Sequence, residues 1–381
     1  MCIRDSWYLA PRPPARRITD AATEAPAQAM GVDRRRFVGG ALGIGSAAVL
    51  VGGLGRMLQR QSEVVGERDD LVLPDADSPS APLPTDADLA VEGLDPFVTP
   101  NRDFYRIDTA LVVPQVSKDS WSLKIGGMVD EPIELTFDDL LSRPQIERYI
   151  TLSCVSNPIG GDLIGNALWQ GVRLRDVLDE AGVQPGATQV VSRSIDGWTA
   201  GTPTEIIMDD RDAMLAVAMN GEPLPARHGY PVRMVVPGLY GYVSATKWVT
   251  EIELTRWEDY DAYWVPRGWS KEGPIKTMSR IDTDRPGPRP GERVVAGIAW
   301  AIHRGVSRVQ VRLDGGEWID ADLGGVPSED TWVQWRAVVE APPGKYMAES
   351  RAVDGDGEPQ TEETAPVAPN GAQGYPRRVI E

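Results

Sequence analysis

The sequence predicts an α+β core followed by an all-β tail, and two observations carry this prediction. Between Phe97 and about residue 281, strand-like alternation and helix-like spacing mix without a regular βαβ order, which favours an α+β fold over a doubly wound sheet. After a proline-rich joint at residues 286–290, the helical spacing ends and short strand-like runs follow at regular intervals. Such runs over about a hundred residues are typical of a β-sandwich of immunoglobulin type.

The chain begins with a basic leader over residues 1–36. Residues 1–60 hold nine arginines and four acidic residues, whereas the whole chain has a net charge of −17. Met1–Ser6 resembles a translated adapter sequence, so we expect the natural N-terminus to be missing and give Cys2 no weight.

Residues 37–58 are expected to be a membrane segment or an export signal. The uncharged run Phe37–Gly55 has 19 residues, including seven glycines, and is near the length that spans a bilayer. Arginines precede it, which fits a transmembrane anchor under the positive-inside rule and also the Arg-Arg-x-Phe motif of a twin-arginine signal. Both interpretations stay open, and both place the body on the extracytoplasmic side. A buried amphipathic helix is disfavoured because the run has no polar face.

Residues 59–95 are expected to be an acidic, proline-rich linker. Residues 61–95 hold ten acids, one arginine and four prolines, a composition that buries too little apolar surface to order itself. The core then covers residues 96–281 and the tail residues 282–381.

Local patterns predict the elements of the core and the tail in order. The core elements are a strand at 121–125 before a Gly-Gly turn, a helix at 137–141, a buried strand at 149–154 with a loop to residue 161, a helix at 174–181, and strands at 232–236 and 247–254. The tail strands are 294–302, 309–313, 333–335 and 346–353.

Composition excludes several classes of function. The excess of acids argues against nucleic acid as a partner, because phosphate binding needs clustered Lys and Arg. Outside the leader there is one cysteine, Cys154, and the whole chain has two histidines, His228 and His303. These residues cannot form a disulfide framework, a thiolate zinc site, a cysteine-ligated iron–sulfur cluster or a bis-histidine haem site. Any metal-containing redox cofactor bound here must therefore need very few ligands from the protein.

Three clusters of residues carry candidate chemistry: residues 99–106, residues 152–161 and residues 221–248. In the third, Gly-rich turns and strand ends combine with Arg, His and Lys donors, which is how proteins hold an anionic phosphate. Taken singly, Cys154 also fits a buried small hydrophobe and His228 a structural histidine, and the basic residues of the clusters also fit a solvated face.

The clusters together resemble a known family. The loop Leu-Ser-Cys154-x-Ser-Asn, the run Asn-Gly-Glu-Pro-Leu-Pro to His-Gly-x-Pro-Val-Arg, the following Val-Val-Pro-Gly to Lys-Trp and the β-sandwich tail are similar to the sulfite oxidase family of molybdopterin-dependent oxidoreductases. The resemblance covers roughly residues 95–381 and implies molybdenum held by a single pterin dithiolene and one protein cysteine. From the counts of Cys and His we expect no haem, iron–sulfur cluster or zinc.

The resemblance also implies roles for individual residues. Cys154 is the expected molybdenum ligand, and the reacting centre is expected to include Arg102, Arg106 and Tyr240. The expected cofactor-binding residues are Asn101, Tyr105, Arg106, Cys154, Ser194, His228, Arg233, Ser244, Thr246 and Lys247. The tail resembles the family's dimerisation domain, which implies a homodimer.

The chain departs from sulfite-oxidising members at two places. Those members carry two arginines after the Asn of the cysteine loop, where this chain has Pro158 and Ile159, and an arginine where it has Pro100. Cations that would hold a sulfite dianion are thus missing at these three positions, so the reaction class is firmer than the substrate.

The leading hypothesis is two-electron oxygen-atom transfer on a small sulfur compound or oxyanion, with the electrons exchanged with a separate electron-transfer protein or membrane redox partner. A molybdopterin-dependent sulfoxide reductase is the alternative within the family, and the tail argues against it. Metal-free catalysis by Cys154 with His228 or His303 as base, and an anchored immunoglobulin-like binding protein, are alternatives of other classes.

Overall fold

A computed structural model describes residues 63–381 of the chain. The expected leader, and the expected anchor or signal at residues 37–58, lie outside these residues. Between residues 63 and 381 no helix combines the length and the apolar character needed to cross a membrane.

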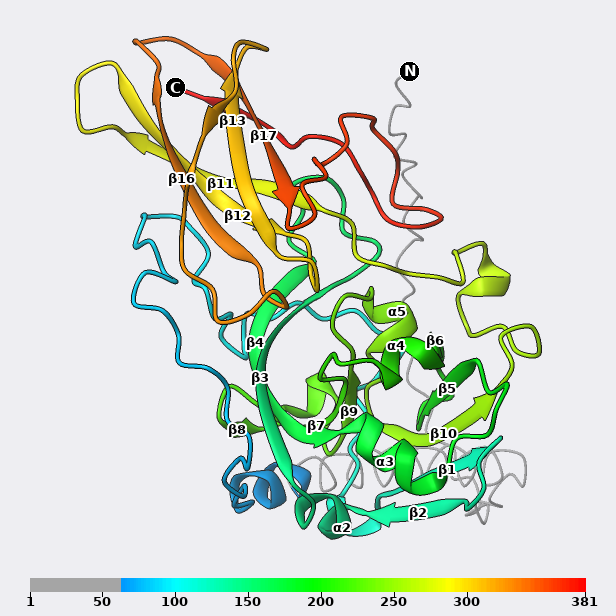
Figure 1. The fold of residues 1–381 in the computed structure, drawn as a ribbon. Coiled ribbons are helices and arrows are strands. Elements are labelled where there is room, and N and C mark those ends of the chain that lie inside the picture. Colours follow the sequence, from blue (N-terminus) through cyan, green and yellow to red (C-terminus); the bar gives the residue numbers. More distant parts are fainter. Residues whose placement is uncertain (1–62) are drawn as a thin grey trace, which may run out of the picture. The chain divides into compact units, whose positions relative to one another are not determined.

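The core contains two β-sheets of unequal curvature (Figure 1). One has the strand order β2-β1-β10-β5-β6, in which β1 and β10 are parallel and the other pairs antiparallel. The other has the order β3-β4-β7-β8, with β9 paired to β7. Their bounds are β1 (Ser122–Gly127), β2 (Ile133–Thr136), β3 (Gln145–Ser153), β4 (Ile164–Arg173), β5 (Gln189–Ser194), β6 (Thr199–Pro203), β7 (Met214–Met219), β8 (Glu222–Pro223), β9 (Arg233–Val235) and β10 (Val249–Thr255).

Short helices join these strands: α2 (Phe137–Leu141), α3 (Leu174–Ala181), α4 (Thr204–Met208) and α5 (Gly241–Ser244). Thr136 and Asp139 form a capping box at the start of α2, in which each side chain accepts from the other's backbone N–H. The buried residues of α3 are Leu174, Val177, Leu178 and Ala181, at the spacing of one helix face. The two helices predicted from this spacing are confirmed at the predicted residues.

The sheet of β3, β4 and β7 is buried on both faces. Along β7, Leu215 and Val217 belong to one hydrophobic cluster, while Met214, Ala216 and Met219 belong to another. A strand covered on both sides needs no alternation of polar and apolar residues, which is why β7 reads as the unbroken apolar run Met-Leu-Ala-Val-Ala-Met.

The tail is a sandwich of two four-stranded antiparallel sheets, β11-β12-β16-β15 and β14-β13-β17-β18. Side chains from both sheets form one hydrophobic cluster around Trp335. The predicted sandwich is therefore present, and its assignment to the immunoglobulin type stays a prediction. The bounds are β11 (Met278–Pro286), β12 (Glu292–Trp300), β13 (Val306–Leu313), β14 (Ile319–Asp320), β15 (Asp322–Leu323), β16 (Val333–Glu340), β17 (Tyr346–Asp354) and β18 (Arg377–Ile380).

The core and the sandwich are joined by buried contacts at the end of β3, whose long pairing with β4 runs toward the tail in Figure 1. Thr151 donates its backbone N–H to the Asp330 carbonyl oxygen at 2.9 Å, and its Oγ1 accepts from the Trp332 N–H at 2.8 Å. The Trp332 indole N–H donates to the carbonyl oxygen of Phe97 at 3.0 Å.

The acidic segment, residues 71–95, differs from the linker that its composition predicts. Its backbone is bonded to buried polar side chains of the body: Pro74 accepts from Gln170 and Asp95 from Gln334, both at 2.7 Å. Ser78 also forms a parallel bridge with Ile146 at the edge of β3. Composition misses this packing because the segment contributes carbonyl groups and the body supplies the partners.

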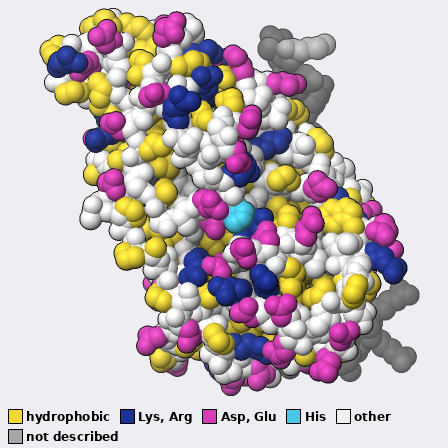
Figure 2. Space-filling model, in the orientation of Figure 1, with side chains coloured by type: hydrophobic (Ala, Val, Ile, Leu, Met, Phe, Trp, Pro, Cys, Tyr) yellow, Lys and Arg dark blue, Asp and Glu magenta, His cyan; other side chains and the backbone are white. Residues whose placement is uncertain are grey.

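Acidic and basic side chains are interspersed over the face of the molecule shown in Figure 2. No continuous basic patch is visible on this face.

Candidate functional site

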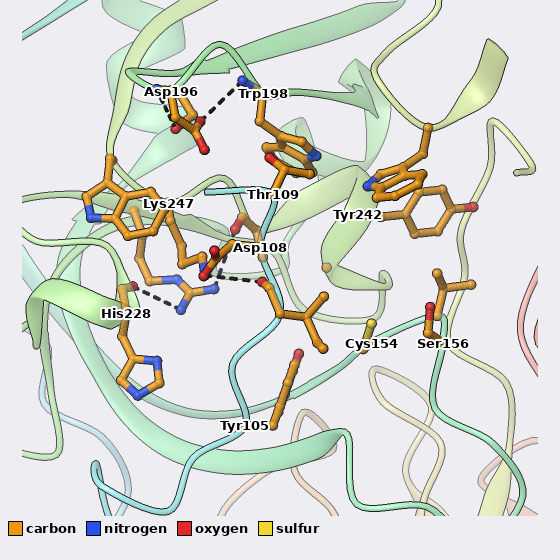
Figure 3. Close-up of a pocket in the computed structure, with 18 of the residues that line it drawn as sticks. Tyr105, Asp108, Thr109, Cys154, Ser156, Asp196, Trp198, His228, Tyr242 and Lys247 are labelled. Carbon is orange, nitrogen blue, oxygen red and sulfur yellow. Dashed lines mark hydrogen bonds and ion pairs between the residues drawn. The ribbon is translucent and has the colours of Figure 1, made fainter. Parts of the chain in front are cut away.

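One pocket of the core gathers the chemistry of all three sequence clusters (Figure 3). Its empty space is about 920 Å³, which includes the part open to solvent. Its lining residues include Tyr105 from the first cluster, Cys154 from the second, and His228, Arg233 and Lys247 from the third.

Cys154 stands directly after β3, in the loop that joins β3 to β4. Its N–H donates to Leu163 O at 2.9 Å, and its carbonyl accepts from the Asn157 N–H at 3.0 Å. The Asn157 Oδ1 accepts from the Leu163 N–H at 3.0 Å, and a Cβ on Gly161 would lie only 2.4 Å from that oxygen. Burial raises the pKa of the Cys154 thiol, against opposing hydrogen bonds from Ser156. The loop therefore presents a buried, protonated thiol to the pocket.

Arg233, the first residue of β9, is a buried guanidinium without a carboxylate partner among residues 63–381. Its Nη1 donates to His228 O at 3.2 Å and its Nη2 to Ala245 O at 3.5 Å, while its Nε has no partner there. The guanidinium carbon lies 4.8 Å from the Trp169 ring centroid. Burial lowers the pKa of Arg233 to about 10, so the group is still charged at neutral pH. A buried cation without a carboxylate partner is costly, so an anionic ligand bound beside Arg233 would be stabilising.

Lys247 and Arg106 share one carboxylate, that of Asp108. The Lys247 Nζ lies 2.6 Å and the Arg106 Nε 2.7 Å from Asp108 Oδ2. Burial lowers the pKa of Lys247 to about 8, although the hydrogen bond to Asp108 opposes the shift. Burial also acts to raise the pKa of Asp108, but the hydrogen bonds from Arg106 and Lys247 outweigh it and the pKa is lowered. Asp108 is therefore an anion at neutral pH, within a basic part of the pocket.

His228 is held neutral at the same end. Burial, followed by the charge of Arg233, lowers its pKa to about 3. Its Nε2 lies 3.1 Å from the Asn101 carbonyl oxygen and 3.2 Å from Arg227 Nε. A neutral imidazole here can hydrogen-bond a ligand without adding charge.

Two further predicted residues also line the pocket, Tyr105 and Ser194. Burial, reinforced by Cys154, raises the pKa of Tyr105, so its phenol stays protonated and can donate a hydrogen bond. Gly229 lets the backbone pack closely against Arg233 and Lys247. A Cβ at this position would lie 3.0 Å from the Arg233 Cβ and 3.1 Å from the Lys247 Cβ.

The remaining predicted residues lie around the pocket rather than in its lining. The Asn101 Nδ2 donates to Met219 O at 3.1 Å. The Ser244 Oγ donates to Leu239 O and Tyr240 O, and Thr246 Oγ1 lies 2.6 Å from Ser192 Oγ. Tyr240 is buried, with a pKa that burial raises to about 12. These groups can position the lining but do not face its cavity.

Arg102 is not brought to the pocket. Its side chain is 85% exposed and pairs with the neighbouring Asp103, so solvent satisfies it. Arg102 was expected at the reacting centre, but the structure places its side chain in solvent and not in the pocket lining. Its backbone carbonyl contributes instead, by accepting from Arg227 Nη2 at 2.6 Å.

The sequence clusters missed an aromatic part of the lining. Trp198, Trp264 and Trp269 line the pocket together with Tyr242, which lies within the third cluster but had no assigned role. The density of aromatic residues between Trp257 and Trp269 was the available signal, but such a run reads equally well as core. Asp108 was missed as well, because an acid is not expected in a basic pocket.

Comparison with known proteins decides the family. The oxidoreductase molybdopterin binding domain matches residues 110–264. Sulfite oxidase of Gallus gallus is 31% identical over 321 residues, which cover 71% of this chain and 70% of that enzyme. The chain belongs to the sulfite oxidase family of molybdopterin-dependent oxidoreductases.

Other members extend this comparison. An uncharacterised oxidoreductase of Bacillus subtilis, YuiH, is 37% identical over 153 residues, or 40% of this chain and 74% of that protein. Human mitochondrial sulfite oxidase is 31% identical over 322 residues, but the match spans only 58% of its length. The crystal structure of the sulfane dehydrogenase SoxCD from Paracoccus pantotrophus superposes with a TM-score of 0.64 at 27% identity, covering 77% of this chain and 82% of that one.

Membership makes the chain an oxidoreductase and implies molybdenum–molybdopterin, and the pocket fits this group. The cofactor carries a phosphate, and Arg233 offers a buried charge with an unpartnered Nε. Its metal needs one protein thiolate, and Cys154 is the one free cysteine of the described residues. The anchored binding protein considered above is not supported, since it leaves both features unexplained.

Proposed function

We propose that the protein catalyses two-electron oxygen-atom transfer on a small sulfur compound or oxyanion and exchanges the electrons with a separate redox protein. One observation carries the proposal: a lone buried thiol and a buried, unpaired guanidinium face the same pocket. When bound, the cofactor supplies the two-electron redox chemistry, and the protein supplies binding, orientation and electrostatics.

The residues of the pocket divide this work. Cys154 would hold the metal, and its raised pKa means that metal binding must displace a proton from the thiol. Arg233 and Lys247 would hold the cofactor phosphate, and neutral His228 with Tyr105 would hydrogen-bond the pterin. Arg106 is positioned through Asp108 and would keep that carboxylate charged.

The electron partner and the substrate class rest on the comparisons and on the composition. The similar structure is named a sulfane dehydrogenase, which supports a sulfur compound as substrate. Among the described residues, His228 lies in the pocket and His303 pairs with Asp330. These positions support an electron-transfer protein or a membrane redox partner as the source or acceptor of the electrons. Metal-free catalysis with Cys154 as the nucleophile is disfavoured, because the raised pKa of its thiol leaves little of the nucleophilic thiolate.

The surroundings of the enzyme are proposed from the sequence. We place the body on the extracytoplasmic side, reached through the membrane segment or export signal at residues 37–58. We assign residues 96–281 to the catalytic domain and residues 282–381 to an immunoglobulin-like dimerisation domain, so that the enzyme is a homodimer.

Metal and pterin analysis of the protein, expressed in a host that makes the cofactor, tests this function. We expect about one molybdenum and one pterin per chain, with loss of molybdenum in Cys154→Ser and loss of pterin in Arg233→Ala. Arg336→Ala serves as the matched control, because Arg336 is an exposed sandwich residue that pairs loosely with Asp322 at 3.7 Å. A wild-type protein without molybdenum, or full activity in Cys154→Ser, would contradict the proposal.

A further inference from the structure

The connection between β17 and β18 reaches back from the sandwich to the core. In Figure 1 it leaves the sandwich as a long red loop. Ala365 and Gln373 form an antiparallel bridge within this connection, and we call residues 365–374 the tail hairpin. Its base is fixed to the sandwich, because the buried Gln360 donates from Nε2 to Gly374 O at 2.8 Å.

The tip of the tail hairpin contacts two parts of the core that carry site residues. A Cβ on Gly371 would lie 2.6 Å from the Tyr240 hydroxyl oxygen, so the two residues are in close contact. The carbonyl oxygen of Pro369 accepts from the Ser270 N–H at 2.9 Å. Ser270 in turn accepts from the hydroxyl of Tyr242, which lines the pocket, at 2.7 Å.

The base of the tail hairpin contacts the loop that carries Cys154. A Cβ on Gly374 would lie 3.1 Å from Ile159 Cδ1, and Ile159 belongs to the loop between β3 and β4. Tyr240 is close to the same thiol, since burial and then the charge of Cys154 raise the pKa of Tyr240 to about 12. The loop of Cys154 and the phenol near it therefore both rest on the tail hairpin.

One side chain of the core, Lys276, holds the tail hairpin in place. Its Nζ donates to Gly371 O at 2.7 Å, to Asn370 Oδ1 at 3.2 Å and to Gln373 Oε1 at 3.2 Å. Within the described part of the chain, these three hydrogen bonds and the one from Ser270 join the hairpin to the core. An ammonium group has three N–H donors, so the hairpin uses all of them.

The surroundings of Lys276 differ from those of a lysine in a surface ion pair. Its three acceptors are uncharged, and burial lowers the pKa of Lys276. The backbone nitrogen of Lys276 also lies 3.5 Å from the Tyr240 hydroxyl oxygen. One residue thus binds the tail hairpin with its side chain and faces Tyr240 with its backbone, which fixes the two relative to each other.

We infer that Lys276 is a positioning residue for the thiol of Cys154, because it holds the tail hairpin against Tyr240 and against the Cys154 loop. The sandwich then shapes the catalytic pocket, beyond the dimerisation proposed for it. The role at the metal rests on the proposed function, in which Cys154 would hold molybdenum and small displacements of a ligand are costly. The position of the thiol itself can be measured without any metal.

Alkylation of Cys154 by iodoacetamide tests the inference in the full chain, produced in a host that does not make the cofactor. Mass spectrometry of the peptide that carries Cys154 separates it from Cys2. The wild-type thiol is buried and should react slowly. Lys276→Met should raise the rate by roughly tenfold, and Lys276→Arg should restore most of the protection, since a guanidinium also donates to several acceptors.

Gly371 offers a second variant with a matched control. Gly371→Ala places a Cβ against Tyr240 and should raise the alkylation rate as Lys276→Met does. Gly357→Ala imposes the same kind of backbone strain in the same connection, with φ +88° against +94°, but a Cβ there meets nothing within 4 Å. It should react like the wild type, as should Lys345→Met, which alters an exposed sandwich lysine paired with Glu381.

The dependence on urea separates positioning from a merely structural role. If Lys276→Met only destabilised the fold, Cys154 would react through global unfolding, and its rate would climb with the first additions of urea. A local displacement of the loop gives a fast rate that stays constant at low urea concentrations, and this is the result that we expect.

A wild-type rate in Lys276→Met, a rate that climbs with urea from the start, or equal rates in Gly371→Ala and Gly357→Ala would overturn the inference. If Lys276→Met does not fold, the two glycine variants decide. The proposed function is judged separately, by the molybdenum content of the wild type from a host that makes the cofactor. In that host Lys276→Met should contain less molybdenum than Lys345→Met.

Discussion

The sequence alone predicted that Arg233 and Lys247 belong to the site. Both stand among glycine turns and strand ends, where fixed cations are typical of phosphate binding. The sequence does not reveal that Asp108, from a loop 139 positions earlier, pairs with Lys247. This pairing is a property of the tertiary fold, so local charge patterns could not predict it.

If Lys247 holds the cofactor as proposed, cofactor retention should depend on pH. Its pKa is lowered to about 8, so its charge is present below that value and is lost as the pH rises through it. A bound phosphate raises this pKa and delays the loss. We expect wild-type enzyme to release its pterin faster at about pH 9.5 than at about pH 7, and Lys247→Arg to show a flatter profile because a guanidinium stays charged.

Pterin fluorescence after gel filtration at each pH measures this release. Asp108→Asn provides the comparison, since removal of the carboxylate should lower the Lys247 pKa further and move the release to lower pH. An identical pH profile in the wild type and Lys247→Arg would show that Lys247 does not hold the cofactor.

At the scale of elements, the β3–β4 hairpin positions the thiol. The alternation and apolar run at 149–154 predicted the end of β3 and the loop that follows, but β4 was not predicted. In the sequence, the two glycines of β4 suggest an interruption of the strand. In the structure they let neighbouring segments approach β4 closely: a Cβ on Gly171 would lie 2.0 Å from Leu215 O, and one on Gly165 would lie 2.7 Å from the Phe104 ring. Both contacts are distant in sequence.

Asn157 is expected to control the geometry of this loop. Asn157→Ala removes the acceptor of the Leu163 N–H, which should destabilise the fold by about 1 kcal/mol and loosen the segment that carries Cys154. We expect molybdenum content to fall more than thermal stability suggests. Asn157→Asp keeps an acceptor oxygen and should retain more metal than Asn157→Ala. Equal metal content in both variants, measured against protein concentration, would contradict this role.

At the scale of the whole molecule, the junction of core and sandwich contains a titratable pair. His303 Nδ1 lies 3.0 Å from Asp330 Oδ1, and the backbone carbonyl of Asp330 accepts from Thr151 of β3. The hydrogen bond with Asp330 raises the pKa of His303, against burial and the charge of Arg211, while Glu329 reinforces it. The change of pattern after the proline-rich joint predicted two domains here, but not the contacts that join them.

This pair should make stability depend on pH. Because the folded pKa of His303 is raised, its contribution is full below the ordinary pKa of 6.5 and is lost as the pH rises through the raised value. We choose His303→Asn because the residue has φ +67°, which Asn tolerates. Its Tm should lie further below the wild-type Tm at about pH 5.5 than at about pH 8.5. A gap that does not change with pH would rule out this contribution.

The packing of the N-terminal part of the body bears on how the protein should be produced. From composition alone, one would start a recombinant chain at residue 96, where the globular pattern begins. Such a chain would strip Gln170 and Gln334 of their carbonyl partners and remove Asp95 from Arg280. It would also remove Glu67, which accepts from the Tyr230 hydroxyl at 2.6 Å. An expression clone that starts no later than residue 63 keeps these partners, and we expect the shorter one to yield aggregated protein.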